Sequence, residues 1–336
     1  MRRILVVRLR SIGDTVLATP SLIALKRFLP NAQIDVLLED WVAPVLEGFD
    51  AVDNVLIVGK TKKSRVEVAW RIRQNEYDVV FNLHGGTTAT FFVRTSGAKY
   101  RVGFKDYQYS FLYTHRVPPS LEFWQDEHAH SAEQQLALLG SVGVPVADKP
   151  KSRLAVTQTA LSSINEKLQS EIQNPKSKIA LFHPVAAFDT KQWATENFAR
   201  VAQYLYEKEF QIIAVATKKE REVLDKLKEL SKIQITTFDD LTLPEITALA
   251  SKAEIFVGND SGIAHIAAAV NTPSVVIFGS SSRHYWRPWT NAPNEIVYEE
   301  MSCQPCAGYF CKEFDEPKCI KRVSVENVIR AIAKIV

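Results

Sequence analysis

The chain has 336 residues, of which 46% are hydrophobic and 24% are charged, as is usual in soluble globular proteins. This length suffices for about two domains, and the net charge of +3 is too small to indicate nucleic-acid binding. No apolar stretch approaches the ~18 residues of a membrane-spanning helix, and the run after Arg3 is too short for a signal peptide. We therefore expect a cytoplasmic protein.

The first half of the chain alternates between short apolar runs and helical segments. Strands are predicted over 4–9, 34–38, 55–58 and 79–83, because these runs are continuously apolar, as in parallel strands covered on both faces. Helices are predicted over 15–28, 42–46 and 64–75. The pattern loosens after residue 107, where one helix is predicted over 129–139. A polar segment over 160–171 then leads to a predicted linker at 174–176.

The alternation restarts in the second half. Strands are predicted over 179–183, 212–215, 235–237, 255–257 and 275–278. Helices are predicted over 195–207, 219–230, 243–250, 262–269 and 323–335. The sequence therefore predicts two α/β domains, 1–170 and 171–336, and ligands in such folds bind beyond the carboxyl ends of the strands.

The turn between the first strand and the first helix holds Gly13 and Asp14. Glycine permits close approach of the backbone, and aspartate either caps a helix or directs a carboxylate at a ligand above the sheet. Basic residues gather around this turn and again from Lys60 to Arg65. These charges are either a solvated rim or a surface for an anionic partner such as phosphorylated lipid or a membrane.

Residues 256–279 read FVGNDSGIAHIAAAVNTPSVVIFG. A strand ends at Val257 and a helix opens at Gly262, so free amides and the helix dipole form an anion site there. Asp260 and Ser261 either cap the helix or contact a ligand, and His265 lies one turn along. Taken singly, each of these residues is better explained as a cap or a buried histidine.

In order along the chain, these blocks resemble glycosyltransferase family 9, the ADP-heptose:lipopolysaccharide heptosyltransferases. The blocks are RLR at 8–10, IGD at 12–14, RVGF at 101–104, a helix with His128 and His130, HPVAAFDTKQW at 183–193, and 256–279. The resemblance implies a GT-B fold, in which two Rossmann-like domains face each other across a cleft. It implies inverting, metal-independent transfer of heptose from ADP-heptose to a lipopolysaccharide core or lipid A–Kdo type acceptor. We further expect a monomer that contacts the inner face of the cytoplasmic membrane.

The resemblance also assigns roles to residues. Asp14 is the expected base for the acceptor hydroxyl, with Gly13, Arg10, Lys62 and Arg65 on the acceptor side. Lys191 is the expected partner of the leaving diphosphate. Donor binding is expected from Asp260, Ser261, Gly262, His265, Ala187 and Glu220, although Glu222 is equally available for the ribose. At 186–187 two alanines stand where some members carry hydroxyl residues. An aromatic pair, Phe123 and Trp124, is expected to touch the acceptor.

Four cysteines, Cys303, Cys306, Cys311 and Cys319, form a C-x2-C-x4-C-x7-C pattern in a loop of the second domain. Disulfides are not expected in a reducing cytosol, so the pattern indicates either a structural zinc site or four reduced thiols. Three other functions stay open on the sequence alone. They are transfer from another nucleotide-sugar, sugar-nucleotide epimerisation, and nucleotide-sugar binding without catalysis, which would not need Asp14.

Overall fold

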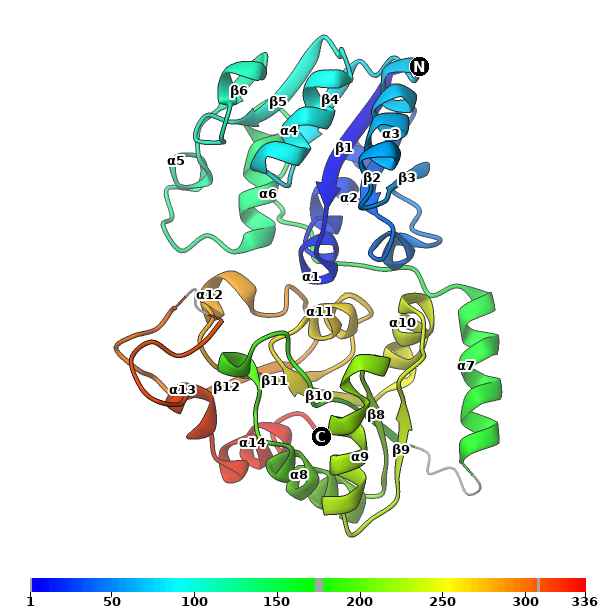
Figure 1. The fold of residues 1–336 in the computed structure, drawn as a ribbon, viewed down its shortest axis with the longest axis vertical. Helices are drawn as coiled ribbons and strands as arrows, with labels where there is room; N and C mark the ends of the chain where they lie inside the picture. Colours follow the sequence, from blue (N-terminus) through cyan, green and yellow to red (C-terminus); the bar gives the residue numbers. More distant parts are fainter. Residues whose placement is uncertain (1, 173–177, 307–308) are drawn as a thin grey trace. The chain divides into compact units, whose positions relative to one another are not determined.

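The computed structural model describes residues 2–172, 178–306 and 309–336. The chain forms two compact units, Met1–Ala155 and Val156–Val336 (Figure 1). The division falls before the expected boundary at residue 170 because helix α7 (Gln158–Glu171) packs on α10 (Leu243–Lys252) of the second unit. Ser163 Oγ donates to Glu245 Oε1 at 2.6 Å, and Lys167 Nζ lies 2.9 Å from the same oxygen. The linker predicted at 174–176 lies outside the described residues.

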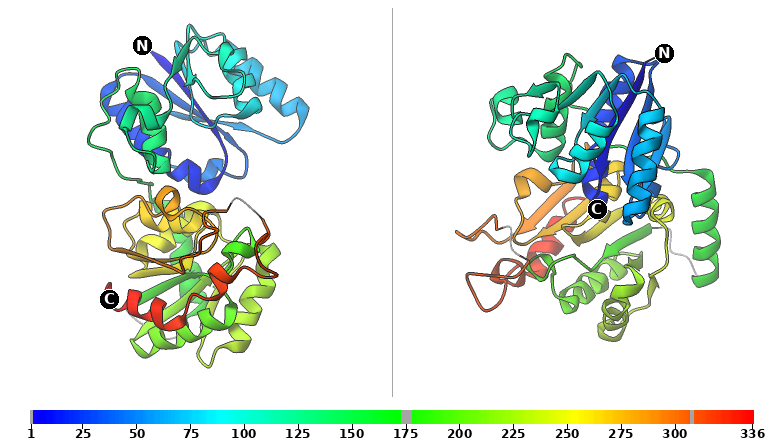
Figure 2. Two further views of the ribbon diagram at one scale, coloured as in Figure 1. Left: turned by 90° about the vertical axis from the view of Figure 1, so that its left-hand side faces the viewer. Right: turned by 45° about the horizontal axis from the view of Figure 1, so that its top comes forward.

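The first unit is built on a parallel sheet of six strands in the order β3-β2-β1-β4-β5-β6. Helices cover both faces of this sheet (Figure 2). The strands are β1 (Arg3–Leu9), β2 (Gln33–Glu39), β3 (Asn54–Val58), β4 (Val79–Asn82), β5 (Tyr100–Phe104) and β6 (His115–Val117). The helices are α1 (Ile12–Val16), α2 (Thr19–Phe28), α3 (Lys62–Gln74), α4 (Gly86–Thr95), α5 (Ser120–Trp124) and α6 (Ser131–Gly140), with 3-10 turns η1 (Ala43–Leu46) and η2 (Ser110–Leu112).

The second unit repeats this plan with the sheet order β12-β11-β10-β7-β8-β9, again all parallel. Its strands are β7 (Lys178–His183), β8 (Phe210–Val215), β9 (Ile235–Phe238), β10 (Ile255–Asn259), β11 (Ser274–Phe278) and β12 (Asn294–Tyr298). Its other helices are α8 (Thr195–Glu207), α9 (Arg221–Leu230), α11 (Gly262–Ala269), α12 (Arg283–Trp286), α13 (Lys318–Lys321) and α14 (Val325–Ile332), with η3 (Asp189–Lys191) and η4 (Lys218–Glu220).

Both units share one connectivity, in which the first and fourth strands lie side by side and the chain winds outward in both directions from them. In open α/β sheets of this kind, ligands bind where the strand order reverses. The pairs β1–β4 and β7–β10 therefore mark one ligand-binding position in each unit.

The core of the second unit is anchored by Trp193, which is fully buried. Its ring packs edge-on against Phe198 at 5.0 Å, and its Nε1 donates to the Val323 carbonyl at 2.9 Å. A buried indole needs such an acceptor for its N–H, so the tryptophan ties α8 to the segment before α14. The residue two positions before it is Lys191, which is thereby carried by a fixed part of the core.

Several predicted elements differ from those observed. The helix expected over 15–28 is two helices, because the chain breaks at Leu17 and Ala18 and α2 restarts with Pro20 in its first turn. Strands β5, β6 and β12 and helix α4 were not predicted. The reason for α4 is that it opens on Gly85 and Gly86, whose positive φ angles are typical of a turn.

The helix expected to contain His128 and His130 begins after both of them. His130 is the N-cap of α6, where its Nδ1 accepts from the Ala132 amide at 3.1 Å. Within the described residues, no helix is long and apolar enough to cross a bilayer.

Candidate active site

The β7–β10 edge of the second unit brings Lys191 and Asp260 together. Lys191 ends η3, which follows β7, and Asp260 directly follows β10. Lys191 Nζ lies 2.7 Å from Asp260 Oδ2, and Ser281, from the loop after β11, donates a hydrogen bond to the same oxygen. The aspartate side chain is 5% exposed and the lysine 20%. One ammonium group is thus held at a defined place and still reaches solvent.

Ser261 and Gly262 open α11 beside this pair. Ser261 is the N-cap of α11, and its Oγ lies 3.0 Å from His183 Nδ1 at the end of β7. Burial lowers the pKa of His183 to about 4, against a smaller opposing effect of the Glu220 carboxylate. The imidazole is therefore neutral at pH 7 and adds no positive charge beside the N-terminus of α11.

Glu220 closes the η4 turn after β8. Its Oε2 accepts from the Thr217 amide at 3.0 Å and from Thr217 Oγ1 at 2.7 Å. This is a capping arrangement, which holds the carboxylate at the same edge as His183. Glu222 stands in the first turn of α9, one element further along.

The loop that carries Lys191 is fixed from the side of β11. Ser280 N donates to the Thr190 carbonyl at 3.1 Å, and the hydroxyls of the same two residues are 2.9 Å apart. A Cβ on Gly279 would lie 2.0 Å from that carbonyl oxygen, so only glycine allows the two backbones to approach this closely. The position of Lys191 therefore depends on a close backbone contact that motif reading did not find.

The cysteine-containing segment joins the same support. Gln304 Nε2 donates to the Gly279 carbonyl at 2.6 Å, and the Cys306 amide donates to the Ser280 carbonyl at 2.9 Å. The ring of Tyr309 packs edge-on against Phe188, two residues before Thr190, at 4.6 Å. The loop before α13 thus lies directly against the residues that hold Lys191.

In the first unit, the β1–β4 edge holds Asp14. Its Oδ1 lies 2.5 Å from Nη2 of Arg8, and its Oδ2 accepts from Ser11 Oγ at 3.0 Å. The buried Arg8 also donates to the Leu83 carbonyl at 2.8 Å. Asp14 is part of α1 rather than the residue before a helix, and its side chain is 26% exposed. The carboxylate is oriented by two donors and remains accessible.

His84 lies beside this pair and was not among the predicted site residues. Its Nδ1 is 3.5 Å from Arg8 Nη1, and burial, together with the positive charge of Arg8, lowers the pKa of His84 to about 4. The side chain of Asn82 accepts from the amides of His84 and Gly85 at 3.0 Å, which shapes the turn into α4. The signal in the sequence was the polar His-Gly-Gly turn after an apolar strand.

Other predicted residues lie elsewhere or are buried. Arg10 is largely exposed and lies 4.0 Å from Glu39. Lys62 and Arg65 lie on α3, a different element from the one that holds Asp14. Ala187 is exposed, whereas His265 is buried within α11. Gly13 is buried in α1.

The aromatic pair Phe123 and Trp124 is half-buried, and its contact with the acceptor stays a prediction. The Trp124 Nε1 donates to the Glu133 carbonyl at 2.7 Å, and its ring packs on Phe123 at 4.8 Å. Lys149 Nζ lies 4.4 Å from the centre of the indole ring. These contacts fasten α5 to α6, which is a structural role.

The expected zinc site is not supported. Among the residues that the structure describes, no group of three or more histidine, cysteine or acidic side chains is arranged to hold a metal. Cys319 is buried in α13, while Cys303, Cys306 and Cys311 are half-exposed, and all four are free thiols. Burial, and then the charges of the other three sulfurs, raise the pKa of Cys319.

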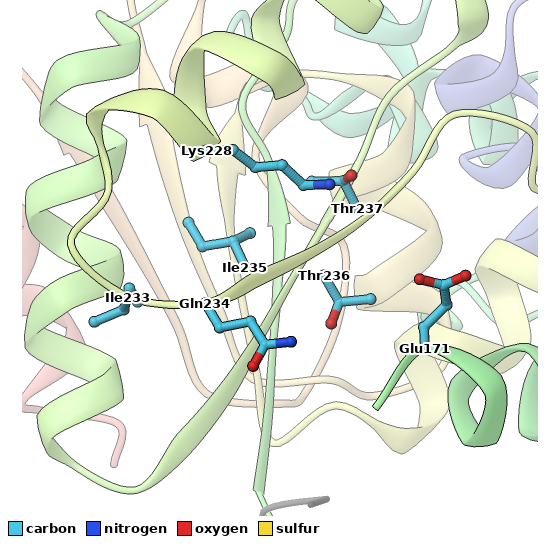
Figure 3. Close-up of a pocket in the computed structure, with 7 residues that line it drawn as sticks. All are labelled: Glu171, Lys228, Ile233, Gln234, Ile235, Thr236 and Thr237. Atoms are coloured by element: carbon cyan, nitrogen blue, oxygen red, sulfur yellow. The ribbon is translucent and has the colours of Figure 1, made fainter. Parts of the chain in front are cut away.

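A cavity of about 350 Å³ lies along β9, the outer strand of the second sheet (Figure 3). Lys228, Glu171 and residues 233–237 line it. None of the predicted site residues lines this cavity, so it is separate from the Lys191–Asp260 edge.

The two Rossmann-like units of one connectivity define a fold of the GT-B class. The chain belongs to glycosyltransferase family 9 (heptosyltransferase), whose family model matches residues 65–315. Family, fold class and enzyme class predicted from the motifs are thereby confirmed.

Individual relatives agree with this assignment. The chain is 27% identical to lipopolysaccharide heptosyltransferase 3 of Escherichia coli strain K12, over 96% of this chain and 95% of that protein. It is 24% identical to lipooligosaccharide heptosyltransferase 2 of Campylobacter jejuni strain 81116, over 96% of each.

The fold is similar to that of a family 9 glycosyltransferase from Veillonella parvula, with a TM-score of 0.88 and 20% identity over 99% of this chain and 97% of that one. It is also similar to that of E. coli ADP-heptose lps heptosyltransferase II, with a TM-score of 0.83 and 19% identity over 100% and 98% of the two chains.

Proposed function

We propose that this enzyme transfers heptose from ADP-heptose to a lipopolysaccharide core acceptor at the inner face of the cytoplasmic membrane. Membership of family 9 and the printed functions of its relatives support the donor and the acceptor class. The observation that carries the proposal is the Lys191–Asp260 pair at the strand-order reversal of the second unit, beside the N-terminus of α11.

The departing ADP develops negative charge on its diphosphate, which must be neutralised. In this proposal the Lys191 ammonium meets the diphosphate, and the amides of Ser261 and Gly262 donate to its oxygens. Asp260 holds the lysine in place before the donor binds. Glu220, fixed by Thr217, accepts from a ribose hydroxyl, and Ala187 and His265 shape the surroundings of the sugar and phosphates. All of these residues lie in the second domain, which the sequence bounded as 171–336. The proposal therefore assigns the nucleotide-sugar to that domain.

The acceptor hydroxyl must lose its proton as it attacks the anomeric carbon. Asp14 takes that proton in this proposal, with its carboxylate oriented by Arg8 and Ser11. The bond from the anomeric carbon to the phosphate oxygen breaks as the new glycosidic bond forms, with inversion at that carbon. The neutral imidazole of His84 donates or accepts a hydrogen bond to the acceptor and adds no charge to the site.

The test measures release of nucleoside diphosphate from ADP-heptose, with UDP- and GDP-sugars as controls, in the presence of lipopolysaccharide core acceptor. We expect turnover with the ADP-sugar alone. Asp14→Asn is expected to bind the donor in calorimetry as the wild type does, and to transfer heptose about 10²- to 10⁴-fold more slowly. Asp148→Asn, at an exposed ion pair with Arg27, is the matched control and keeps full activity. Turnover with another nucleotide-sugar would refute the assigned donor.

A further inference from the structure

Helices α3 and α4 cover one face of the first sheet (Figures 1 and 2). Their inner sides enter a single apolar cluster with residues of the strands beneath. The contributors are Val68, Ala69 and Ile72 from α3, and Ala89, Phe92 and Val93 from α4. The opposite sides of both helices are therefore turned away from the sheet. We call these outer sides the α3–α4 surface.

The α3–α4 surface exposes large apolar side chains. Val66 and Trp70, one helical turn apart on α3, are 65% and 63% exposed, and Phe91 on α4 is 43% exposed. A single exposed apolar residue is ordinary in a soluble protein. Three on neighbouring helices, one of them a tryptophan, are typical of a surface with a partner.

The same surface is strongly basic. Residues 60–73 hold six basic side chains and one acidic one, a net charge of +5. Lys62, Lys63 and Arg73 lie three or four positions from Val66 or Trp70, which puts them on the same side of α3. Cations therefore lie at both ends of the apolar stripe, and the one acidic residue of the segment, Glu67, pairs with Lys63 at 3.9 Å.

Arg73 is held in this arrangement by the packing of α3 on the end of α4. Its Nη1 is 3.4 Å from the Ser96 carbonyl. The guanidinium occupies the space over Gly97, where a Cβ would lie only 1.4 Å from that nitrogen. The basic rim of the α3–α4 surface is thus built into the fold at this point.

We propose that the α3–α4 surface docks onto an anionic phospholipid bilayer. Lysine and arginine around an exposed tryptophan suit the headgroup layer, because the cations meet phosphates while the indole enters the boundary with the acyl chains. An acidic protein surface would complement the same charges, and absence of binding to anionic vesicles would favour it over a bilayer. The proposal rests on the proposed function, in which the acceptor is a membrane lipid, and assigns the surface that meets that membrane.

The α3–α4 surface also lies close to the proposed catalytic base in the fold. Helix α4 begins at Gly86, two residues after His84, and His84 lies beside Arg8 and Asp14. An acceptor carried by the same bilayer would therefore be delivered near the start of α4, next to the carboxylate that we propose as the base. In this proposal the phospholipids of the bilayer take no part in the transfer reaction itself.

The test is co-sedimentation of the full chain with vesicles that contain no acceptor. One set of vesicles is phosphatidylcholine alone, and the other is phosphatidylcholine with about 30% phosphatidylglycerol. We expect binding to the anionic vesicles only, weakened by salt. Lys62→Ala with Lys63→Ala should lower the partition coefficient about 25-fold, at about fivefold for each charge. Trp70→Ser should lower it roughly tenfold. Because all three side chains are exposed, the variants should fold normally.

The matched controls are Lys208→Ala with Lys252→Ala, two exposed lysines of the second unit, and Trp41→Ser, an exposed tryptophan of the first. The proposal would be overturned by equal binding to neutral and anionic vesicles, or by an equal effect of the control and test variants. It would also be overturned if the protein bound only to vesicles that contain the acceptor. Transfer to a deacylated, water-soluble acceptor separates the two proposals. The rate of transfer to this soluble acceptor should be the same in Trp70→Ser as in the wild type. If the wild type itself does not transfer heptose to it, the proposed function is contradicted.

Discussion

Acid should weaken the second unit through His183. The imidazole has a pKa of about 4 when folded, against 6.5 in its ordinary state, because burial penalises its charged form. Between these values the unfolded chain binds a proton that the folded chain does not, so stability is complete above pH 6.5 and is lost as the pH falls towards 4. From pH 7.5 to pH 5 this one group should remove about 2 kcal/mol of unfolding free energy.

The variant His183→Asn keeps a neutral polar group near Nδ1 for Ser261 and cannot titrate in this range. Its unfolding free energy should therefore fall by about 2 kcal/mol less than that of the wild type over the same pH interval. Urea unfolding read by hydrogen exchange in peptides from β7 and β10 follows the second unit by itself. Carboxylates titrate in both proteins, so their contribution cancels when the unfolding free energy of the variant is subtracted from that of the wild type. An equal pH dependence would show that the imidazole is protonated or solvated in the folded protein, and the assigned burial would be wrong.

Four further outcomes follow from the two edges. Asp14→Asn should lower kcat by about 10²- to 10⁴-fold with donor affinity unchanged, and a parallel loss of ADP binding in calorimetry would refute its role as base. Lys191→Ala should weaken donor binding by about tenfold or more, whereas Lys191→Arg should recover part of it, and equal behaviour of the two would argue against a charge contact. Gly279→Ala should raise KM for the donor and cost about 1–3 kcal/mol of stability, because its Cβ collides with the Thr190 carbonyl; unchanged kinetics would show that this loop does not position Lys191. Gln304→Ala should raise KM severalfold and leave kcat unchanged, since it removes only the hydrogen bond to Gly279; a loss confined to kcat would contradict that reasoning.

The sequence alone was sufficient to predict two α/β units and the residues at the ends of their buried strands. Parallel strands read as continuous apolar runs with polar turns after them, and the resemblance to family 9 then singled out Asp14, Lys191 and Asp260 among the residues of those turns. Elements with weak signals were missed for physical reasons. Strand β6 has three residues, two of them exposed, and α4 begins with two glycines that resemble a loop. Neither pattern carries enough periodicity to be recognised.

Tertiary structure alone decided which distant residues meet. Arg8 and His84 are neighbours because β1 pairs with β4 across more than seventy positions of sequence, and no local pattern encodes that pairing. The close contact of Gly279 with Thr190 likewise requires two loops from different strands. Spacing suggested a metal site for the cysteines, but a binding site depends on the arrangement of the side chains, and among the described residues no group is arranged to hold a metal. Local chemistry follows from the order of residues along the chain, whereas the geometry of a site follows from which strands pair and how closely their loops pack.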